Sequence, residues 1–270
     1  KKEQFRVKWF TGVLAFTIPF LLATLFVVFM RQVNIGWITQ WYGQVGYSDI
    51  LAYDSVWIAL SMLAQSYLFM VTFFSVLMLM QSLIGQHIAA SIIGSIVVAA
   101  PWFILEAGGA TLSRIFNNYR LKLYNIKWSS LYFLMEPNRD ISIHEIRLDQ
   151  IQGRELSYDI INIDPIISMD HYIIKIVILM VIAVLAFYVG TRFYEKNDNS
   201  RNGYLLMFPW VGKILVPGVT ICSGLLGNNL IRLFSRIESM SFEIGTLIVS
   251  GLIGYLVITK MIGLTEKHGA

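Results

Sequence analysis

Charged residues are scarce in this chain. Only 14% of its 270 residues are Asp, Glu, Lys or Arg, and 56% are hydrophobic, whereas soluble proteins have about 25% charged and 45–50% apolar residues. This balance excludes an ordinary soluble domain, a disordered chain and a collagen-like repeat. The single cysteine, Cys222, cannot form an internal disulfide, so a disulfide-rich scaffold is excluded too. We therefore expect a protein whose surroundings are largely lipid.

The sequence also lacks the short motifs that mark several classes of enzyme. It contains no G-x-x-x-x-G-K-[ST] phosphate loop, no G-x-S-x-G nucleophile turn and no H-E-x-x-H metal motif. The four histidines, His87, His144, His171 and His268, fall in different segments and form no zinc pattern with cysteine. These absences predict a chain that is not an enzyme and that has no catalytic, metal-binding or cofactor-binding residues of its own.

Six apolar runs are long enough to cross a bilayer, which takes about 20 helical residues. They cover residues 9–30, 55–80, 88–106, 172–192, 209–228 and 243–263. Four charged residues, Lys175, Lys213, Glu243 and Lys260, lie near the ends of these runs, where we expect them to reach the membrane surface. The sequence thus predicts an all-α polytopic membrane protein with about six transmembrane helices.

A polar insert divides the predicted helices into two groups. Three helices lie in 1–106, three lie in 171–270, and the 64 residues between them form the insert, 107–170. Its first part mixes basic and aromatic residues, which favours amphipathic helices, and its second part alternates as β-strands do. We expect a small extracellular α+β insert between the third and fourth helices. Its role is open between a substrate-binding or gating cap and a structural lid.

The distribution of Lys and Arg predicts the orientation in the membrane, because short cytoplasmic loops carry an excess of both. With a cytoplasmic N-terminus, nine lie inside and three outside. The inner ones are Lys1, Lys2, Arg6, Lys8, Arg192, Lys196, Arg201, Lys260 and Lys267, and the outer ones are Arg31, Arg232 and Arg236. We expect a cell-membrane protein with both termini cytoplasmic, and we attribute its net charge of +4 to the membrane surface rather than to nucleic acid. Residues 31–54, rich in Trp and Tyr, are typical of a membrane interface.

Uncharged polar side chains in the second predicted helix are candidates for lining a pathway: Gln65, Ser66 and Thr72. Carriers driven by ions or protons usually hold carboxylates or histidines at the bilayer midplane. Here the midplanes lack them, so transport would take its energy from another chain. For Gln65 an interhelical hydrogen bond is the alternative.

Small residues recur four apart at Gly85 and Ala89, Ala90 and Gly94, Ser223 and Gly227, and Ser250 and Gly254. Residues at this spacing share one helix face and let two helices approach closely. We interpret these pairs as helix packing within one subunit, with a dimer face as the alternative.

Three segments on the predicted cytoplasmic side carry a family resemblance. They are residues 1–14 (KKEQFRVKWFTGVL) before Ile18-Pro19, residues 83–89 (LIGQHIA) before Ala100-Pro101, and residues 194–203 (YEKNDNSRNG) before the helix that starts near Pro209. In this layout the chain resembles the ABC-2-type permeases of Gram-positive bacteria, and in particular the Ytr/acetoin-utilisation type, whose relatives include antimicrobial-peptide and phenol-soluble-modulin exporters. Tyr194 and Gly203 match the family's YxxRxxExxG pattern, whereas Asn197 and Ser200 replace its Arg and Glu.

The resemblance implies the transmembrane subunit of an ATP-binding cassette exporter, which moves a peptide or amphipathic compound by alternating access. A separate ATPase would bind ATP and Mg²⁺, and a second permease, identical or homologous, would complete the complex. It also implies a further segment before Lys1. The candidate ATPase-contact residues are Lys2, Glu3, Arg6, Gln86, His87, Glu195, Lys196 and Arg201. Attraction to anionic membrane lipid explains the basic residues near the N-terminus equally well.

Two other classes of function stay open at this stage. A non-transporting membrane sensor or assembly protein would use the insert, 107–170, to bind a ligand or partner. An intramembrane enzyme would need polar groups such as Gln65, His87 and Glu106 to converge at one depth.

Overall fold

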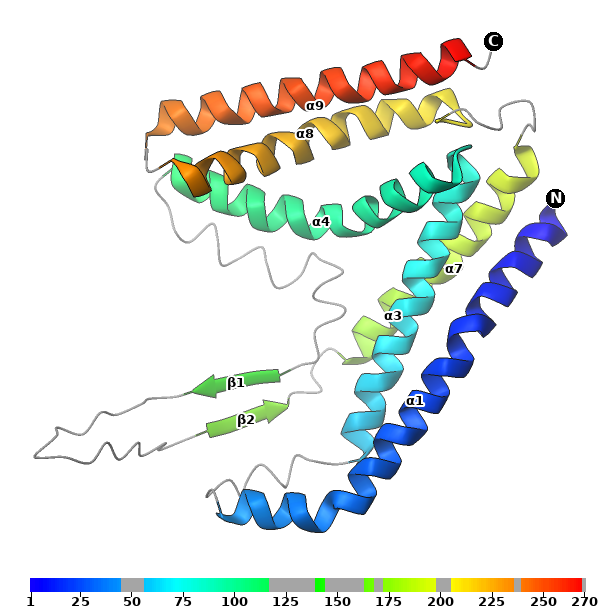
Figure 1. Cartoon of the computed structure of the whole chain (residues 1–270), viewed down its shortest axis with the longest axis vertical. Coiled ribbons are helices and arrows are strands. Elements are labelled where there is room, and N and C mark those ends of the chain that lie inside the picture. Colours follow the sequence, from blue (N-terminus) through cyan, green and yellow to red (C-terminus); the bar gives the residue numbers. More distant parts are fainter. Residues whose placement is uncertain are drawn as a thin grey trace, which may run out of the picture. The chain divides into compact units, whose positions relative to one another are not determined.

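The computed structural model describes residues 1–44, 56–116, 139–143, 163–167, 172–197, 205–235 and 239–268. Within these ranges the elements are α1 (Lys2–Gln44), α3 (Val56–Leu83), α4 (His87–Ile115), β1 (Arg139–Ile143), β2 (Ile163–Ile167), α7 (Tyr172–Lys196), α8 (Pro209–Phe234) and α9 (Met240–His268) (Figure 1). Each predicted apolar run lies almost entirely within one helix. In lipid the backbone has no water to bond to, so a helix, which pairs its own N–H and C=O groups, is the expected form.

Five of these helices, α1, α3, α7, α8 and α9, are long and apolar enough to cross a membrane. The chain is therefore a multi-pass helical membrane protein, as predicted. The fourth helix differs, because α4 bends by 47° between His87–Pro101 and Phe103–Ile115 and is a sixth span only if both parts form one. A bend here is expected, since proline lacks an N–H and its ring clashes with the preceding turn. The sixth span stays a prediction.

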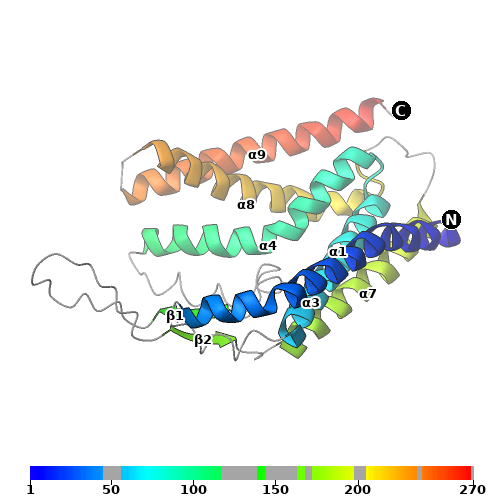
Figure 2. The same cartoon turned by 60° about the horizontal axis from the view of Figure 1, so that its bottom comes forward.

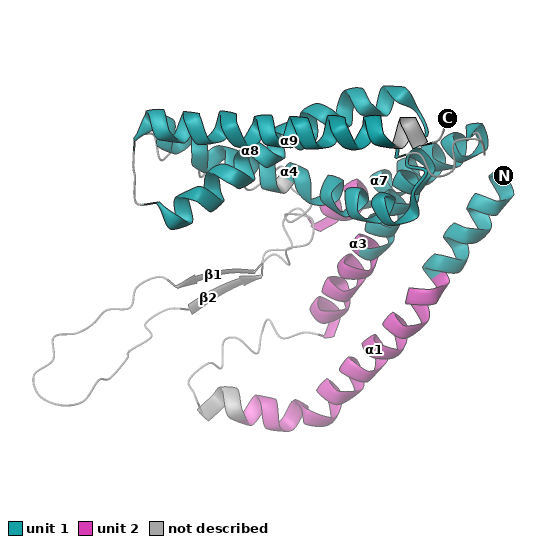
Figure 3. Ribbon diagram, turned by 45° about the horizontal axis from the view of Figure 1, so that its top comes forward, with its two compact units in different colours: residues 1–13, 70–134, 179–270 teal, residues 14–69, 135–178 magenta. Residues whose placement is uncertain are grey.

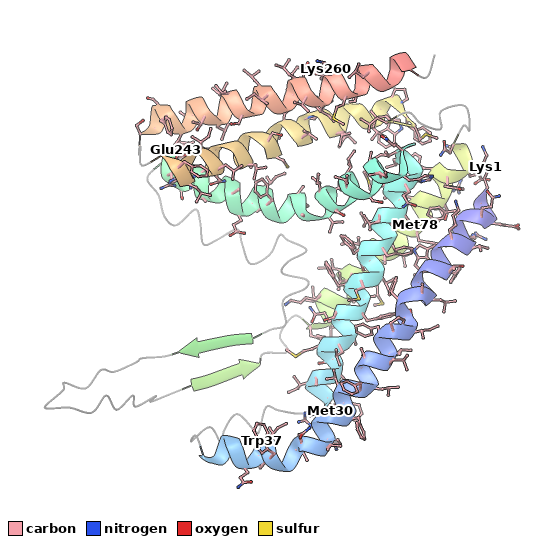
Figure 4. All side chains as sticks on the ribbon, in the orientation of Figure 1. Lys1, Met30, Trp37, Met78, Glu243 and Lys260 are labelled. Carbon is pink, nitrogen blue, oxygen red and sulfur yellow. The ribbon has the colours of Figure 1, made fainter. Side chains whose placement is uncertain are left out.

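The first helix is much longer than a membrane crossing requires. The predicted span ends at residue 30, but α1 continues to Gln44, and its 43 residues extend roughly 65 Å at 1.5 Å each. Its final part carries the exposed Trp37 and turns away from the axis of the preceding part (Figure 4). An exposed tryptophan on such an extension is typical of a membrane interface.

Contacts divide the chain into two compact units (Figure 3). Unit 1 comprises Lys1–Val13, Met70–Leu134 and Leu179–Ala270, and unit 2 comprises Leu14–Phe69 and Met135–Ile178. Several helices therefore contribute to both units.

In unit 2, aromatic side chains connect neighbouring helices. The Tyr67 ring of α3 packs against Phe16 and Phe20 of α1, and its hydroxyl lies 2.7 Å from that of Thr17. The hydroxyl of Tyr172 in α7 donates to the carbonyl oxygen of Ser61 in α3 at 2.9 Å.

The described part of the insert is a strand pair. β1 and β2 are antiparallel, with Arg139 opposite Ile167 and Ile143 opposite Ile163. β1 overlaps the start of the alternating pattern, which runs from Ile141 to Ile151, whereas β2 lies beyond it. The amphipathic helices predicted for 112–135 fall largely outside the described residues, so the α+β insert as a whole stays a prediction. Residues 107–115 belong to α4, because the apolar pattern continues past Gly108 and Gly109.

In unit 1 the ends of several helices meet around one hydrophobic cluster, which we call the basal core. Its buried members are Met80, Leu83, Ile84, Ala90, Leu205, Leu206, Val211, Leu215 and Ile258. They come from the end of α3, the start of α4, the segment before α8, the start of α8 and the last part of α9. Phe193, near the end of α7, packs against them. The Met207 N–H donates to the Leu83 carbonyl oxygen at 2.9 Å and ties the segment before α8 to the end of α3.

The last two helices run side by side through contacts between small residues (Figure 1 and Figure 2). Gly227 lies against Ser250, and Gly254 lies against Ser223, so closely that a Cβ added to either glycine would overlap the serine. These are two of the pairs spaced four apart, and their faces meet each other across α8 and α9. Packing within one subunit is therefore confirmed for these residues.

We predict that Gly227→Val forces α8 and α9 apart and lowers the free energy of unfolding by about 1–3 kcal/mol, the usual effect of overpacking. Thermal unfolding of the purified protein in detergent measures it. Gly263→Val in α9 is the matched control, because an added Cβ there meets nothing within 4 Å. Equal unfolding midpoints for the two variants would contradict the close packing.

Candidate functional site

The predicted ATPase-contact segments meet at the basal end of unit 1. Lys1 Nζ donates to the carbonyl oxygen of Asn197 at 2.5 Å, and Lys8 Nζ donates to the hydroxyl of Tyr194 at 3.2 Å. The start of α1 therefore lies along the end of α7. Ring contacts continue the connection, with the Phe193 centroid 5.3 Å from that of Phe208. The Met207–Leu83 hydrogen bond then leads to the turn between α3 and α4.

We call the described residues 1–8, 84–88, 192–197 and 205–210 the basal cap. Phe5 anchors its N-terminal segment and is fully buried. The Phe5 ring packs against Phe187 and Tyr194, with centroids 6.1 Å and 5.4 Å away, and lies over Gly190. A Cβ at Gly190 would come within 2.8 Å of the Phe5 ring, so the absent side chain leaves room for it. One aromatic side chain thus holds an otherwise polar segment on the helix ends.

The cap presents the predicted contact residues on its surface. Those that the structure describes are all exposed: Lys2, Glu3, Arg6, Gln86, His87, Glu195 and Lys196. Arg201 lies outside the described residues. Segments 1–8 and 192–197 together carry six Lys or Arg and two Glu, so this surface is basic. It has the chemistry to bind an acidic protein surface or anionic headgroups.

The three candidate pathway residues have different surroundings. Thr72 is fully buried, and its hydroxyl donates to the carbonyl oxygen of Leu179 in α7 at 3.1 Å. Ser66 is exposed and bonds the carbonyl oxygen of Met62 in its own helix at 2.9 Å. Gln65, in unit 2, is buried. The structure thus uses Thr72 for an interhelical hydrogen bond.

Of the polar groups considered for an intramembrane enzyme, His87 and Glu106 are not brought together. His87 and Glu106 are both exposed, and they lie 19 residues apart on α4, roughly 28 Å along a helix axis. Gln65 belongs to unit 2. Among the described residues, no group of three or more His, Cys, Asp and Glu is placed to hold a metal ion.

A second polar site, missed by the sequence reasoning, lies at the other end of α4, α8 and α9. We call it the apical cluster. Glu243, only 6% exposed, is its centre. Its Oε1 lies 3.3 Å from Arg114 Nε and 3.9 Å from Arg232 Nη1, and its Oε2 accepts a hydrogen bond from Asn228 Nδ2 at 2.9 Å. The Asn228 Oδ1 accepts from the Thr246 hydroxyl at 2.8 Å. Three helices thus share one carboxylate.

The remaining bonds of the apical cluster fix Arg114. Its Nη2 donates to Thr111 Oγ1 at 3.1 Å and to Asn229 Oδ1 at 3.3 Å. Arg114 and Arg232 lie in the last turns of α4 and α8, and Glu243 lies in the first turn of α9. Each charge therefore has the sign that its helix end favours.

Burial of two charged residues corrects the expectation that all four charges near the span ends reach the membrane surface. Lys213 and Lys260 are exposed, as expected for residues that reach the membrane surface. Glu243 and Lys175 are instead buried, and Lys175 is only 2% exposed. The expectation considered each residue's distance from its own helix end, whereas burial of Glu243 depends on arginines of two other helices. Charges of opposite sign at neighbouring predicted span ends are the signal that could have found the cluster.

An apolar groove of about 710 Å³ begins at the apical cluster and runs between α4, α8 and α9. Leu112, Ile221 and Leu252 are among its walls, and Gly108, Gly224 and Gly251 are among the small residues that hollow it. Thr111 belongs both to the groove and to the apical cluster. None of the three candidate pathway residues lines the groove.

Comparison with known proteins gives no family assignment. No protein-family model, no curated protein and no solved structure matches this chain. Its function must be argued from the residues and their arrangement.

We predict that Phe5→Ala lowers the free energy of unfolding by about 3 kcal/mol, the scale for a large-to-small change in a packed site. The N-terminal segment should loosen, so trypsin should cleave faster after Lys8. Phe26→Ala is the matched control, because this phenylalanine is on the same helix and is 62% exposed. Equal cleavage rates in the two variants would contradict the anchoring role.

We predict that Glu243→Gln destabilises the protein by about 1–2 kcal/mol, because two arginines lose their shared counter-charge while staying partly exposed. The midpoint of thermal unfolding in detergent measures this change. Glu106→Gln removes an exposed carboxylate of the same type from α4 and should leave the midpoint unchanged. An unchanged unfolding midpoint in the Glu243→Gln variant would show that the carboxylate of the apical cluster contributes nothing to stability.

Proposed function

We propose that this chain is the transmembrane subunit of an ATP-binding cassette exporter. It moves a peptide or another amphipathic compound by alternating access, and a separate ATPase binds ATP and Mg²⁺. The observation that carries this proposal is the basal cap. Segments 1–8, 84–88 and 192–197, far apart in the sequence, gather there, and the exposed Lys and Arg of 1–8 and 192–197 make its surface basic. A permease without a nucleotide motif needs a surface at which a separate ATPase can bind and drive its movement.

The cap is also suited to pass a movement on to the helices. Lys1 and Lys8 bond the end of α7, and Phe193 of α7 packs on the basal core. That core holds residues of α3, α4, α8 and α9. Because protein interiors are close-packed and transmit displacement, an ATPase that pulls on the cap would move several helix ends together.

The same core supports the proposed orientation, in which both termini are cytoplasmic. Ile258 and Ile262, in the last part of α9, pack in the basal core, and Phe5 packs on the end of α7 beside it. The two ends of the chain thus belong to one end of unit 1. The excess of Lys and Arg in the cap supports a cytoplasmic position for that end.

A complex of this kind contains a second permease, either another copy or a homologue, and two ATPase subunits. Membrane lipid surrounds the helices, and no nucleic acid takes part. The insert between α4 and α7 would lie on the extracellular side, where the apical ends of α4, α8 and α9 are.

We predict that the tagged permease co-purifies with an ATPase encoded beside it, in mild detergent. Reversing two exposed charges of the cap with Arg6→Glu and Lys196→Glu should weaken this association about tenfold, since charged interface pairs act through complementarity. Quantitative mass spectrometry of the purified complex gives the ATPase-to-permease ratio.

Arg31→Glu reverses a charge at the far end of the predicted first span and serves as the control. It should leave the ratio unchanged. Failure to recover any nucleotide-hydrolysing partner would contradict the proposed function. Equal recovery with the cap variant and the control would contradict the cap as its contact surface.

A further inference from the structure

We propose that the apical cluster and the adjoining groove form a binding site for one anionic membrane phospholipid. The phosphate lies beside Arg114 and Arg232, and one acyl chain lies in the groove. This inference goes beyond the proposed function and does not depend on it.

The charge of the apical cluster favours an anion. Two guanidinium groups share one carboxylate, so the described charged groups of this cluster sum to one positive charge. Both arginines are partly exposed, with 20% of the Arg114 side chain and 35% of the Arg232 side chain accessible. Guanidinium groups are well suited to phosphate oxygens, which they can bind in a bidentate manner.

The position of the cluster matches the depth of a lipid headgroup. Arg114 and Arg232 occupy the last turns of their helices, and Glu243 occupies the first turn of α9. Ends of membrane-spanning helices lie at the bilayer surface. Figure 4 shows Glu243 at one end of α9 and Lys260 in the other half of the helix.

The groove has the dimensions of one leaflet. Its lining on α4 runs from Ile104 to Ile115, a separation of eleven residues, or roughly 16 Å along the helix. Half of the hydrocarbon core of a bilayer is about 15 Å thick. An acyl chain whose headgroup sits at the apical cluster would therefore end where the groove ends.

The shape of the groove distinguishes it from an ordinary lipid-facing surface. An exposed apolar helix face meets lipid wherever it lies, but here three helices form a channel with a floor of small residues. Leu112, Ile221 and Ile248 form exposed apolar walls around it. An acyl chain held on several sides keeps most of its van der Waals contacts, so the headgroup stays beside the arginines.

The test compares two lipids that differ only in headgroup. The full-length protein in detergent is titrated with phosphatidylglycerol or with phosphatidylcholine of identical acyl chains, and bound lipid is counted by native mass spectrometry. We expect phosphatidylglycerol to bind about fivefold more tightly, the usual effect of one net basic charge at an anionic surface. Equal affinity of the two lipids overturns the proposal.

Two variants test the two parts of the site. Arg232→Gln should remove the headgroup preference, and its partly exposed side chain makes it the safer of the two arginines to change. Gly108→Phe should fill the groove, because a Cβ at Gly108 meets only Leu225 at 3.9 Å, and should abolish saturable binding of phosphatidylglycerol. Gly218→Phe adds the same ring at a position of α8 that does not line the groove and has nothing within 4 Å of an added Cβ, and it is the matched control.

Other occupants of the groove give distinguishable results. If a second copy of the chain covers the groove, Gly108→Phe changes the oligomeric state while lipid retention stays as in the control, and the proposal is overturned. Unchanged lipid binding in both Arg232→Gln and Gly108→Phe, with unfolding midpoints equal to that of the parent protein, overturns it as well.

Discussion

The structure of unit 1 depends on how its helices are held together at the basal core. Apolar helices in lipid gain little from hiding their surfaces, because the lipid tails are just as apolar, so close packing and hydrogen bonds must bind them. The core supplies both. Its apolar side chains pack together at the ends of five helices, and the Met207–Leu83 hydrogen bond pairs a backbone N–H before α8 with the last carbonyl of α3. The cap segments 84–88 and 205–210 contribute to this junction, and segment 1–8 is held beside it by Phe5.

The two ends of α4, α8 and α9 are stabilised by opposite chemistry. At the basal end apolar side chains meet, and the charged groups stay on the surface of the cap. At the apical end a buried carboxylate is shared by arginines of two helices. Buried ion pairs add little net stability but are costly to break, so they favour one arrangement of the helices over its alternatives. The apical cluster therefore favours one alignment of the three helices, whereas the basal core holds the helices together.

The sequence predicted the helices well and their partners poorly. Apolar runs about 20 residues long identify membrane helices directly, and all six predicted runs lie almost entirely within helices. The length of α1 beyond residue 30 was missed, because an interfacial helix carries polar residues that resemble a loop. Arg114 was assigned to the insert and Glu243 to the membrane surface, although the two lie 3.3 Å apart. Pairing of this kind depends on residues more than a hundred positions apart, which no local pattern encodes.

The small-residue contacts connect these two ends mechanically. Gly227 against Ser250 and Ser223 against Gly254 interlock α8 with α9 between the basal core and the apical cluster. Such contacts leave no space between the two helices for an added side chain, so we expect a displacement of α8 to be passed on to α9. The third helix of the group, α4, carries the bend at Pro101 between its basal and apical parts. A displacement at the cap would thus reach Glu243 directly through α8 and α9, whereas α4 can absorb part of it at the bend. Such a difference in movement would change the distance between Arg114 and Glu243.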